Sequence, residues 1–210
     1  GVPAEKDVQA VIDAIKNAKF PVLLAGMRSS SANETNAIRK LVEKTNLPVV
    51  ETFQGAGVIS RDLENHFFGR VGLFRNQVGD ELLRKSDLVV TIGYDPIEYE
   101  ASNWNKELDT KVINIDEVPA EITNYMQPTK ELIGNIAGTI EMISDKVDEP
   151  FINQQHLDEL ERKKAIDIAN AMLKDGYKEG DAIPIATKQA EKWYKDASKE
   201  ELEELKHNLI

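Results

Sequence analysis

Short apolar segments alternate with amphipathic stretches over the first two thirds of the chain. Four apolar segments are rich in β-branched residues and a fifth is weaker: residues 22–25, 48–52, 88–92, 112–115 and 131–134. These segments are continuously apolar rather than alternating, so both faces of each strand should be covered, as helices cover a parallel sheet. The pattern predicts a mostly parallel sheet of about six strands.

Helical periodicity fills the intervals between these segments. Val8, Val11, Ile12 and Ile15 share one helical face before the first segment, and residues 37–42 repeat the pattern after it. Shorter helices are expected at residues 80–85 and 120–125, and another at 136–143. This alternation predicts a doubly wound, Rossmann-like α/β domain over residues 1–148, built from right-handed crossovers.

The pattern changes at the polar segment 146–150, which ends in Pro150. No apolar strand pattern follows, and residues 153–173 and 184–210 are rich in Ala, Glu, Lys and Leu. Ser198 and Glu201 have the spacing of a capping box, ahead of a stripe of leucines. We expect residues 149–210 to form an all-helical appendage.

Composition excludes several function classes. The 210 residues carry a formal net charge of −11, which disfavours nucleic acid as a partner. The absence of cysteine excludes disulfides and thiolate metal sites, and the three histidines lack metal-ligand spacing, so we expect no metal site. No apolar run approaches the roughly 20 residues that cross a bilayer, and no signal peptide is recognisable. We therefore expect a cytoplasmic protein without a membrane partner.

The exits of the strands carry the candidate binding residues, because ligands in open α/β sheets bind beyond the carboxyl ends of the strands. Gly26 permits a tight turn and Arg28 could bind a phosphate. The remaining candidates follow the other strands: Gln54, Gly55, Gly93 and Asp116. Asp116 stands where dinucleotide-binding folds place a ribose-binding acid.

Each candidate also has a purely structural interpretation. The loop after the first strand could be a turn with Ser31 or Asn33 as a helix N-cap, and Asp116 could also cap a helix. Gly55 and Gly57 could hold the backbone close to a ligand or to a neighbouring loop. For the loop after the first strand, the turn interpretation is favoured. For Gly55 and Gly57, contact with a ligand and contact with a neighbouring loop are equally favoured.

Charged residues gather in two further stretches. Arg70 and Arg75 flank Gly72, where they suit an anion or, as we favour, ion pairs with Asp80, Glu81 or Asp95. The acidic groups at positions 95, 98 and 100 could be an acid/base set or a cation site. No activated nucleophile or suitably spaced histidine accompanies them, which favours a capped turn.

Five stretches, in this order and spacing, resemble the central domain of the thiamine-diphosphate-dependent enzymes. They lie between about Lys19 and Ile143, and they are residues 19–26, 47–54, 60–64, 68–77 and 91–99. Within that family the likeness is greatest to catabolic acetolactate synthases. The resemblance implies a central structural domain of an enzyme that condenses two pyruvates to 2-acetolactate with release of CO2, in the acetoin and butanediol pathway.

The resemblance also implies what should surround this domain. Family members place thiamine diphosphate and Mg2+ between two outer domains, across a dimer interface, and we recognise neither outer domain in this sequence. We therefore expect the chain by itself to be catalytically inert and to bind neither cofactor. Its implied partners are the outer domains of the same enzyme, in a homo-oligomer.

Flavin-containing relatives bind FAD in the crevice of the central domain. Here Asp95 appears where the resemblance implies an arginine suited to the flavin diphosphate, and an acid there repels phosphate by about 1 kcal/mol or more. We expect the crevice to be vestigial. The open alternatives are a working nucleotide-binding module and a helical interaction element.

The resemblance fades after about Leu160. From Lys163 onward the sequence looks more like a small bacterial helical protein family of no assigned activity. A natural fusion, a rearranged locus and an artificial junction all remain open for this part of the chain.

Overall fold

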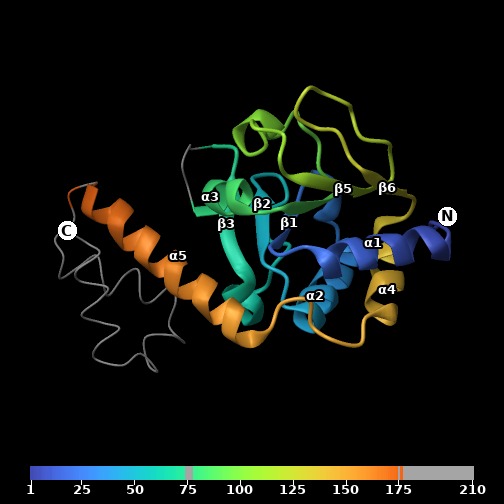
Figure 1. Ribbon diagram of the computed structural model, residues 1–210, viewed down its shortest axis with the longest axis horizontal. Helices are drawn as coiled ribbons and strands as arrows, with labels where there is room; N and C mark the ends of the chain where they lie inside the picture. The colour runs from blue at the N-terminus through green and yellow to red at the C-terminus, as the bar shows by residue number, and fades with distance from the viewer. Residues whose placement is uncertain (74–77, 175, 177–210) are drawn as a thin grey trace. The chain divides into compact units, whose positions relative to one another are not determined.

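The computed structural model describes residues 1–73, 78–174 and 176 (Figure 1). The chain divides into two compact units, Gly1–Ile152 and Asn153–Ile210.

The first unit is built on a six-stranded sheet in which every pairing is parallel. The order across the sheet is β3-β2-β1-β4-β5-β6. The strands are β1 (Pro21–Ala25), β2 (Val49–Thr52), β3 (Phe67–Val71), β4 (Leu88–Ile92), β5 (Lys111–Asp116) and β6 (Lys130–Ile133). Every residue of β1, β2 and β4 is buried, as strands covered on both faces should be. The expected doubly wound, parallel α/β architecture is confirmed.

Helices cover both faces of this sheet (Figure 1). They are α1 (Glu5–Asn17), α2 (Ala32–Thr45), α3 (Val78–Lys85) and α4 (Ile136–Lys146). α4 packs against α1 and α2, whereas α3 packs against β3 and β2. The predicted apolar stripe of α1 is fully buried, from Val8 to Ile15. The order of the strands reverses beside β1, so right-handed crossovers place α2 and α3 on opposite faces.

β3 is the strand that the apolar pattern did not indicate. Its five residues include Gly69 and the exposed Arg70, and only Phe68 and Val71 are buried. This edge strand pairs on one side, with β2, through a register shift between Val49 and Glu51. A short strand with one buried face and a glycine lacks the continuous apolar run by which the others were recognised.

The helix expected at residues 120–125 is wrong. The backbone there is irregular, and the hydroxyl of Thr123 accepts the N–H groups of Tyr125 and Met126 at 3.3 and 3.0 Å. Ala120 donates its N–H to the Glu131 carboxylate at 2.8 Å. Side-chain acceptors therefore satisfy this backbone in place of a helix, which six residues could barely sustain.

The second unit begins with the helix α5 (Gln154–Lys174), which confirms the helical prediction for residues 153–173. Asn153 opens it by accepting the N–H of His156 on its side-chain oxygen at 2.8 Å. Gly176 has a φ of 89° and donates its N–H to the carbonyl of Leu173, as expected of a helix C-cap. The helix predicted at 184–210, with its capping box and leucine stripe, lies outside the described residues.

None of the helices in the described part of the chain is both long enough and apolar enough to cross a membrane.

Candidate functional site

The candidate site is the crevice where the strand order reverses between β1 and β4. Chain segments leave these adjacent strands in opposite directions, toward β2 and toward β5. Loops 26–31 and 93–100 meet Asp116, at the end of β5, at this place, which we call the switch-point crevice. Open α/β sheets bind their ligands at this topological position.

Arg28 lies in the crevice and is held by carboxylates. Its Nε donates to both oxygens of Asp116 at 2.9 and 3.1 Å, and its Nη2 donates to Asp116 Oδ2 at 2.7 Å. Its Nη1 lies 3.3 Å from Asp95 Oδ2. The hydrogen bond to Asp116 is the main reason that the pKa of Arg28 is raised further above its ordinary value. The group expected to bind a phosphate is thus paired within the chain.

Asp116 is 1% exposed and also accepts the N–H of Glu117 at 2.7 Å. No helix follows it directly, because β5 leads into the irregular segment before β6. The helix-capping alternative for Asp116 is therefore wrong. Its carboxylate instead neutralises the guanidinium of Arg28.

Glu98 receives hydrogen bonds from the loops after β1 and β4 and from the last residue of β2. Its two oxygens accept the N–H of Met27, each at 3.1 Å, and Oε1 accepts the N–H of Asp95 at 3.1 Å. The Thr52 hydroxyl donates to Oε2 at 2.6 Å. The acidic stretch after β4 is the capped turn that was favoured from the sequence, since Asp95 also accepts the N–H of Ile97 at 3.1 Å. The roles of Glu98 and Thr52 across the loops were not predicted.

The predicted glycines bring these loops into direct backbone contact. A Cβ on Gly26 would lie 2.5 Å from the carbonyl oxygen of Gly93 and 2.9 Å from a Glu98 oxygen. A Cβ on Gly55 would lie 2.5 Å from the carbonyl oxygen of Ala25. Gly93 has a φ of 57°, and a Cβ there would meet the backbone of Arg28 at 2.7 Å. These distances are shorter than real Cβ atoms allow, so the neighbouring loop already requires each glycine.

The other predicted residues lie beside the crevice rather than within this network. Gln54 is exposed on the turn after β2. Ser31 is the N-cap residue of α2, as expected, but its hydroxyl donates to the Glu34 carboxylate instead of accepting a backbone N–H. The prediction of Ser31 as the N-cap residue is confirmed, but the predicted hydrogen bond from a backbone N–H to its side-chain oxygen is wrong.

Glu51 anchors the loop after β2 from inside the protein. It is 1% exposed, and it accepts the N–H groups of Gly57 and Ile59 at 3.2 and 2.8 Å. Its Oε2 lies 3.5 Å from Arg70 Nε. Arg70 therefore forms the kind of structural ion pair that was favoured, but none of the three partners proposed for it was correct. Arg75 lies outside the described residues.

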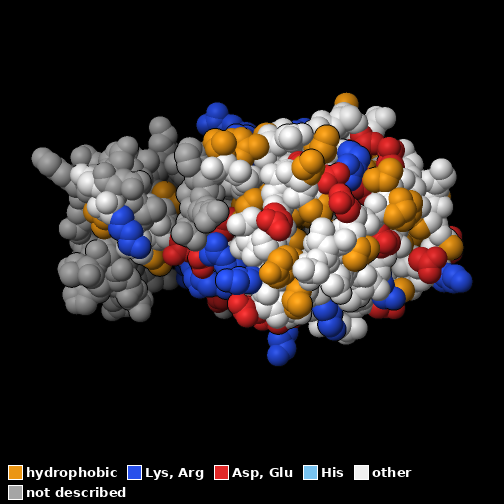
Figure 2. All heavy atoms as spheres, turned by 90° about the horizontal axis from the view of Figure 1, so that it is seen from above, with side chains coloured by type: hydrophobic (Ala, Val, Ile, Leu, Met, Phe, Trp, Pro, Cys, Tyr) orange, Lys and Arg blue, Asp and Glu red, His pale blue; other side chains and the backbone are white. Residues whose placement is uncertain are grey.

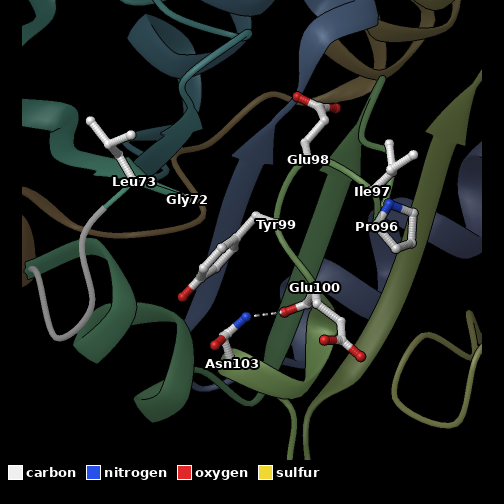
Figure 3. Close-up of a pocket in the computed structure, with 8 residues that line it drawn as sticks. All are labelled: Gly72, Leu73, Pro96, Ile97, Glu98, Tyr99, Glu100 and Asn103. Carbon is white, nitrogen blue, oxygen red and sulfur yellow. Dashed lines mark hydrogen bonds between the residues drawn. The ribbon is translucent and has the colours of Figure 1, made fainter.

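A hollow of about 440 Å³ lies between the exit of β3 and the loop after β4 (Figure 3). Leu73 and Ile97 stand at opposite sides of it, with 62% and 86% of their surfaces exposed. Tyr99 lies between them and donates its hydroxyl to the buried Asp80. The hydroxyl of Tyr94 donates in turn to the carbonyl of Tyr99.

Burial raises the pKa of both tyrosines above 10, and the hydrogen bond to Asp80 raises that of Tyr99 further. Both phenols are therefore neutral donors over the physiological range. Tyr94 also packs edge to face on the buried Trp104, with ring centroids 6.4 Å apart. These groups support the loop after β4 and leave no ionised phenol in the hollow.

Among the described residues, no three His, Cys, Asp or Glu side chains lie together in a way that could hold a metal ion. The ionisable groups of the crevice are instead paired with one another or with backbone N–H groups. The arrangement can stabilise loops, because the Thr52 hydroxyl that donates to Glu98 also accepts the N–H of Gly55 at 3.0 Å.

Comparison of the sequence with those of known proteins places the chain in a family. The sequence profile described as "Thiamine pyrophosphate enzyme, central domain" matches residues 8–143. The chain is 50% identical over 143 residues to "Acetolactate synthase" of Bacillus subtilis, covering 68% of this chain and 25% of that protein. It is 38% identical over 153 residues to "Acetolactate synthase, catabolic" of Raoultella terrigena, covering 72% and 27%.

A further likeness has a different character. Over 50 residues the chain is 54% identical to "Uncharacterized protein YdaT" of Bacillus subtilis, covering 24% of this chain and 33% of that protein. The chain spans about a quarter of the length of the acetolactate synthases that it matches. On the profile match, which extends from α1 to α4, the chain belongs to the family of thiamine pyrophosphate enzyme central domains.

Proposed function

We propose that residues 8–143 serve as the central structural domain of an acetolactate synthase. In this proposal the complete enzyme condenses two pyruvates to 2-acetolactate and releases CO2, and thiamine diphosphate and Mg2+ bind to outer domains. The observation that carries the proposal is the 50% identity over 143 residues to an acetolactate synthase, together with 38% identity to a catabolic one.

The role that we assign to this domain is mechanical. The arrangement of the crevice supports it, because Arg28 is paired with Asp116 and Asp95, and Glu98 is saturated by donors from its own loops. We propose that Gly26, Gly55 and Gly93 serve loop packing at a vestigial site, beside which Gln54 is exposed, and that the chain by itself is inert.

Exposed apolar side chains support an interface at the edge of the sheet formed by the carboxyl ends of the strands. Isolated large apolar residues are common on protein surfaces, but a set grouped at one edge indicates a contact surface. Each of the first five strands is followed by one: Met27, Phe53, Leu73, Ile97 and Val118. Figure 2 shows hydrophobic side chains interspersed with acidic and basic ones on the face of the first unit that is seen from above. We propose that the outer domains of a cytoplasmic homo-oligomer pack on this edge.

Domain replacement tests the proposal. Residues 8–143 of this chain replace the matching segment of the Bacillus subtilis acetolactate synthase, and acetolactate formation from pyruvate is measured with thiamine diphosphate and Mg2+. We expect activity within about tenfold of the parent, which corresponds to less than ~1.4 kcal/mol in the barrier. The matched control is the same chimera carrying Gly26→Val, which should lose activity because a side chain there displaces the loop after β4.

Two outcomes would contradict the proposal. One is a chimera that assembles like the parent enzyme but forms no acetolactate. The other is acetolactate formation by the isolated chain under the same conditions, because the proposal requires outer domains for the reaction.

A further inference from the structure

The hydrogen-bond donors that meet on Glu98 come from the loops where this fold ordinarily receives a ligand. Met27 follows β1, Asp95 follows β4 and Thr52 ends β2. Their two backbone N–H groups and one hydroxyl converge on a single carboxylate over distances of 2.6 to 3.1 Å. In Figure 3 this carboxylate points away from Tyr99 and Asn103, out of the group of side chains that surround the hollow.

Such a donor set fits an anion. Backbone N–H groups that converge on one point form a concave site for an anion, and many phosphate sites are built in this way. The loop after β1 also approaches the carboxylate closely, because a Cβ on Gly26 would lie only 2.9 Å from Glu98 Oε1. The glycine at position 26 therefore keeps this point free of a side chain other than that of Glu98.

The cationic group of the crevice, the guanidinium of Arg28, is also bonded to carboxylates of the chain. Arg28 donates to Asp116 and Asp95 and has no more than 28% of its side chain exposed. Formally, the crevice holds one guanidinium against the three carboxylates of Asp95, Glu98 and Asp116. A phosphate approaching these donors would be repelled by the adjacent Glu98 carboxylate and would find the donors already bonded.

We propose that Glu98 is an internal substitute for a ligand phosphate, which closes a latent anion site at the switch-point crevice. Loss of this carboxylate frees the donors of Met27, Asp95 and Thr52 and removes one negative charge. The site that opens accepts a phosphate group, either free or carried by a nucleotide. This inference deepens the proposal of a vestigial crevice, but it does not depend on the reaction of the complete enzyme.

The experiment measures binding of ADP and of inorganic phosphate, in separate titrations, by calorimetry on the full chain. The variants are Glu98→Ala and, as a matched control from the same loop, Glu100→Ala. Wild type and Glu100→Ala should show no saturable binding below about 1 mM. Glu98→Ala should bind at least one of the two ligands about tenfold tighter or more, a difference of ~1.4 kcal/mol.

The two titrations distinguish the source of the phosphate. Binding of both ligands would show that the phosphate group alone is recognised, and binding of ADP only would show that the crevice also recognises the nucleoside. Two results would overturn the inference: a folded Glu98→Ala that binds neither ligand, and a wild type that binds as tightly as the variant.

A destabilised Glu98→Ala still gives a decisive result. An anion that binds only the folded state raises the thermal midpoint. Phosphate also stabilises folded proteins by exclusion from their surface, so wild type gives the reference for that effect. Compared with chloride at equal ionic strength, phosphate should raise the midpoint of the variant by several degrees more than it raises that of wild type. An equal gain in the two proteins would also overturn the inference. Failure of the domain replacement described above would leave each of these outcomes unchanged.

Discussion

Arg28 and Asp116, 88 positions apart in the sequence, are joined by three hydrogen bonds of 2.7, 2.9 and 3.1 Å across the switch-point crevice. One group follows β1 and the other ends β5, so the contact connects strands that are separated in the sheet by β4. Because Asp116 is almost completely buried, this guanidinium is the principal compensation for its charge.

Arg28→Ala should lower the free energy of unfolding by about 2 kcal/mol, because it leaves the Asp116 carboxylate buried without its cation. This value is below that of a fully buried pair, since Arg28 is partly exposed. Urea denaturation measures the change. The matched control is Lys85→Ala, which removes an exposed ion pair with Glu81 and should change stability by less than about 0.5 kcal/mol. Equal effects of the two substitutions would show that the contact with Asp116 is not stabilising.

Gly26→Ala should destabilise the protein by about 2 kcal/mol through overpacking against the backbone of Gly93 and Tyr94. Gly26 has a φ of −106°, an ordinary extended value, so the close approach of the second loop is the only cause expected. Gly57→Ala is the control, because Gly57 has a φ of 91° and open space around it. That substitution should cost about 1 kcal/mol from backbone conformation alone. A smaller loss at position 26 than at position 57 would contradict the packing argument.

Glu51→Gln should cost about 1.5 kcal/mol, since a buried charged acceptor of two backbone N–H groups is replaced by a neutral amide. The NH2 group of the introduced glutamine would also face the backbone N–H of Gly57 or Ile59, and two donors cannot bond to each other. Thermal unfolding and urea denaturation can both detect the change. Glu121→Gln, at an exposed position, should stay within about 0.5 kcal/mol of wild type. An unchanged stability of Glu51→Gln would mean that the loop after β2 does not depend on this charge.

Stability should fall as the pH rises above about 10, because the pKa values of Tyr94 and Tyr99 are raised above that value in the folded state. The unfolded chain then releases phenolic protons that the folded chain retains, so stability is fully present below pH 10 and decreases above it. Tyr99→Phe should reduce this loss relative to its own stability at pH 8. Denaturation curves at pH 8 and at alkaline pH give the comparison. A slope that is identical in the variant would exclude Tyr99 as a source.

A chain of residues 1–152 should be more stable than one of residues 1–148, by about 2 kcal/mol. The longer chain retains the buried Ile152 and the bonds from the N–H groups of residues 151 and 152 to the Thr45 carbonyl. It also retains the bond from Asn46 Nδ2 to the Ile152 carbonyl at 3.0 Å. Denaturation of the two purified chains tests whether the α/β unit ends nearer 148 or 152. Equal stability would favour the earlier boundary.

Local sequence was sufficient for the buried strands and most helices. Strands covered on both faces need continuous apolar runs, and helices that cover a sheet need a stripe at helical spacing, so both can be recognised without the fold. Those signals were missing for β3, where Gly69 and Arg70 interrupt a strand with one buried face. At residues 120–125 the composition resembled a helix, but Glu131 and the Thr123 hydroxyl supply acceptors for the backbone in an irregular conformation.

The sequence by itself determined the class of the fold and the residues that follow its buried strands, because strand exits follow directly from strand assignment. Only the tertiary structure decided what these residues contact. Glu98 meets Met27 and Thr52 from 71 and 46 positions away, and Arg28 meets Asp116 from 88. Hydrogen bonds and charge pairing act over a few ångströms in space, so a sequence pattern that identifies each group alone does not show that they satisfy one another.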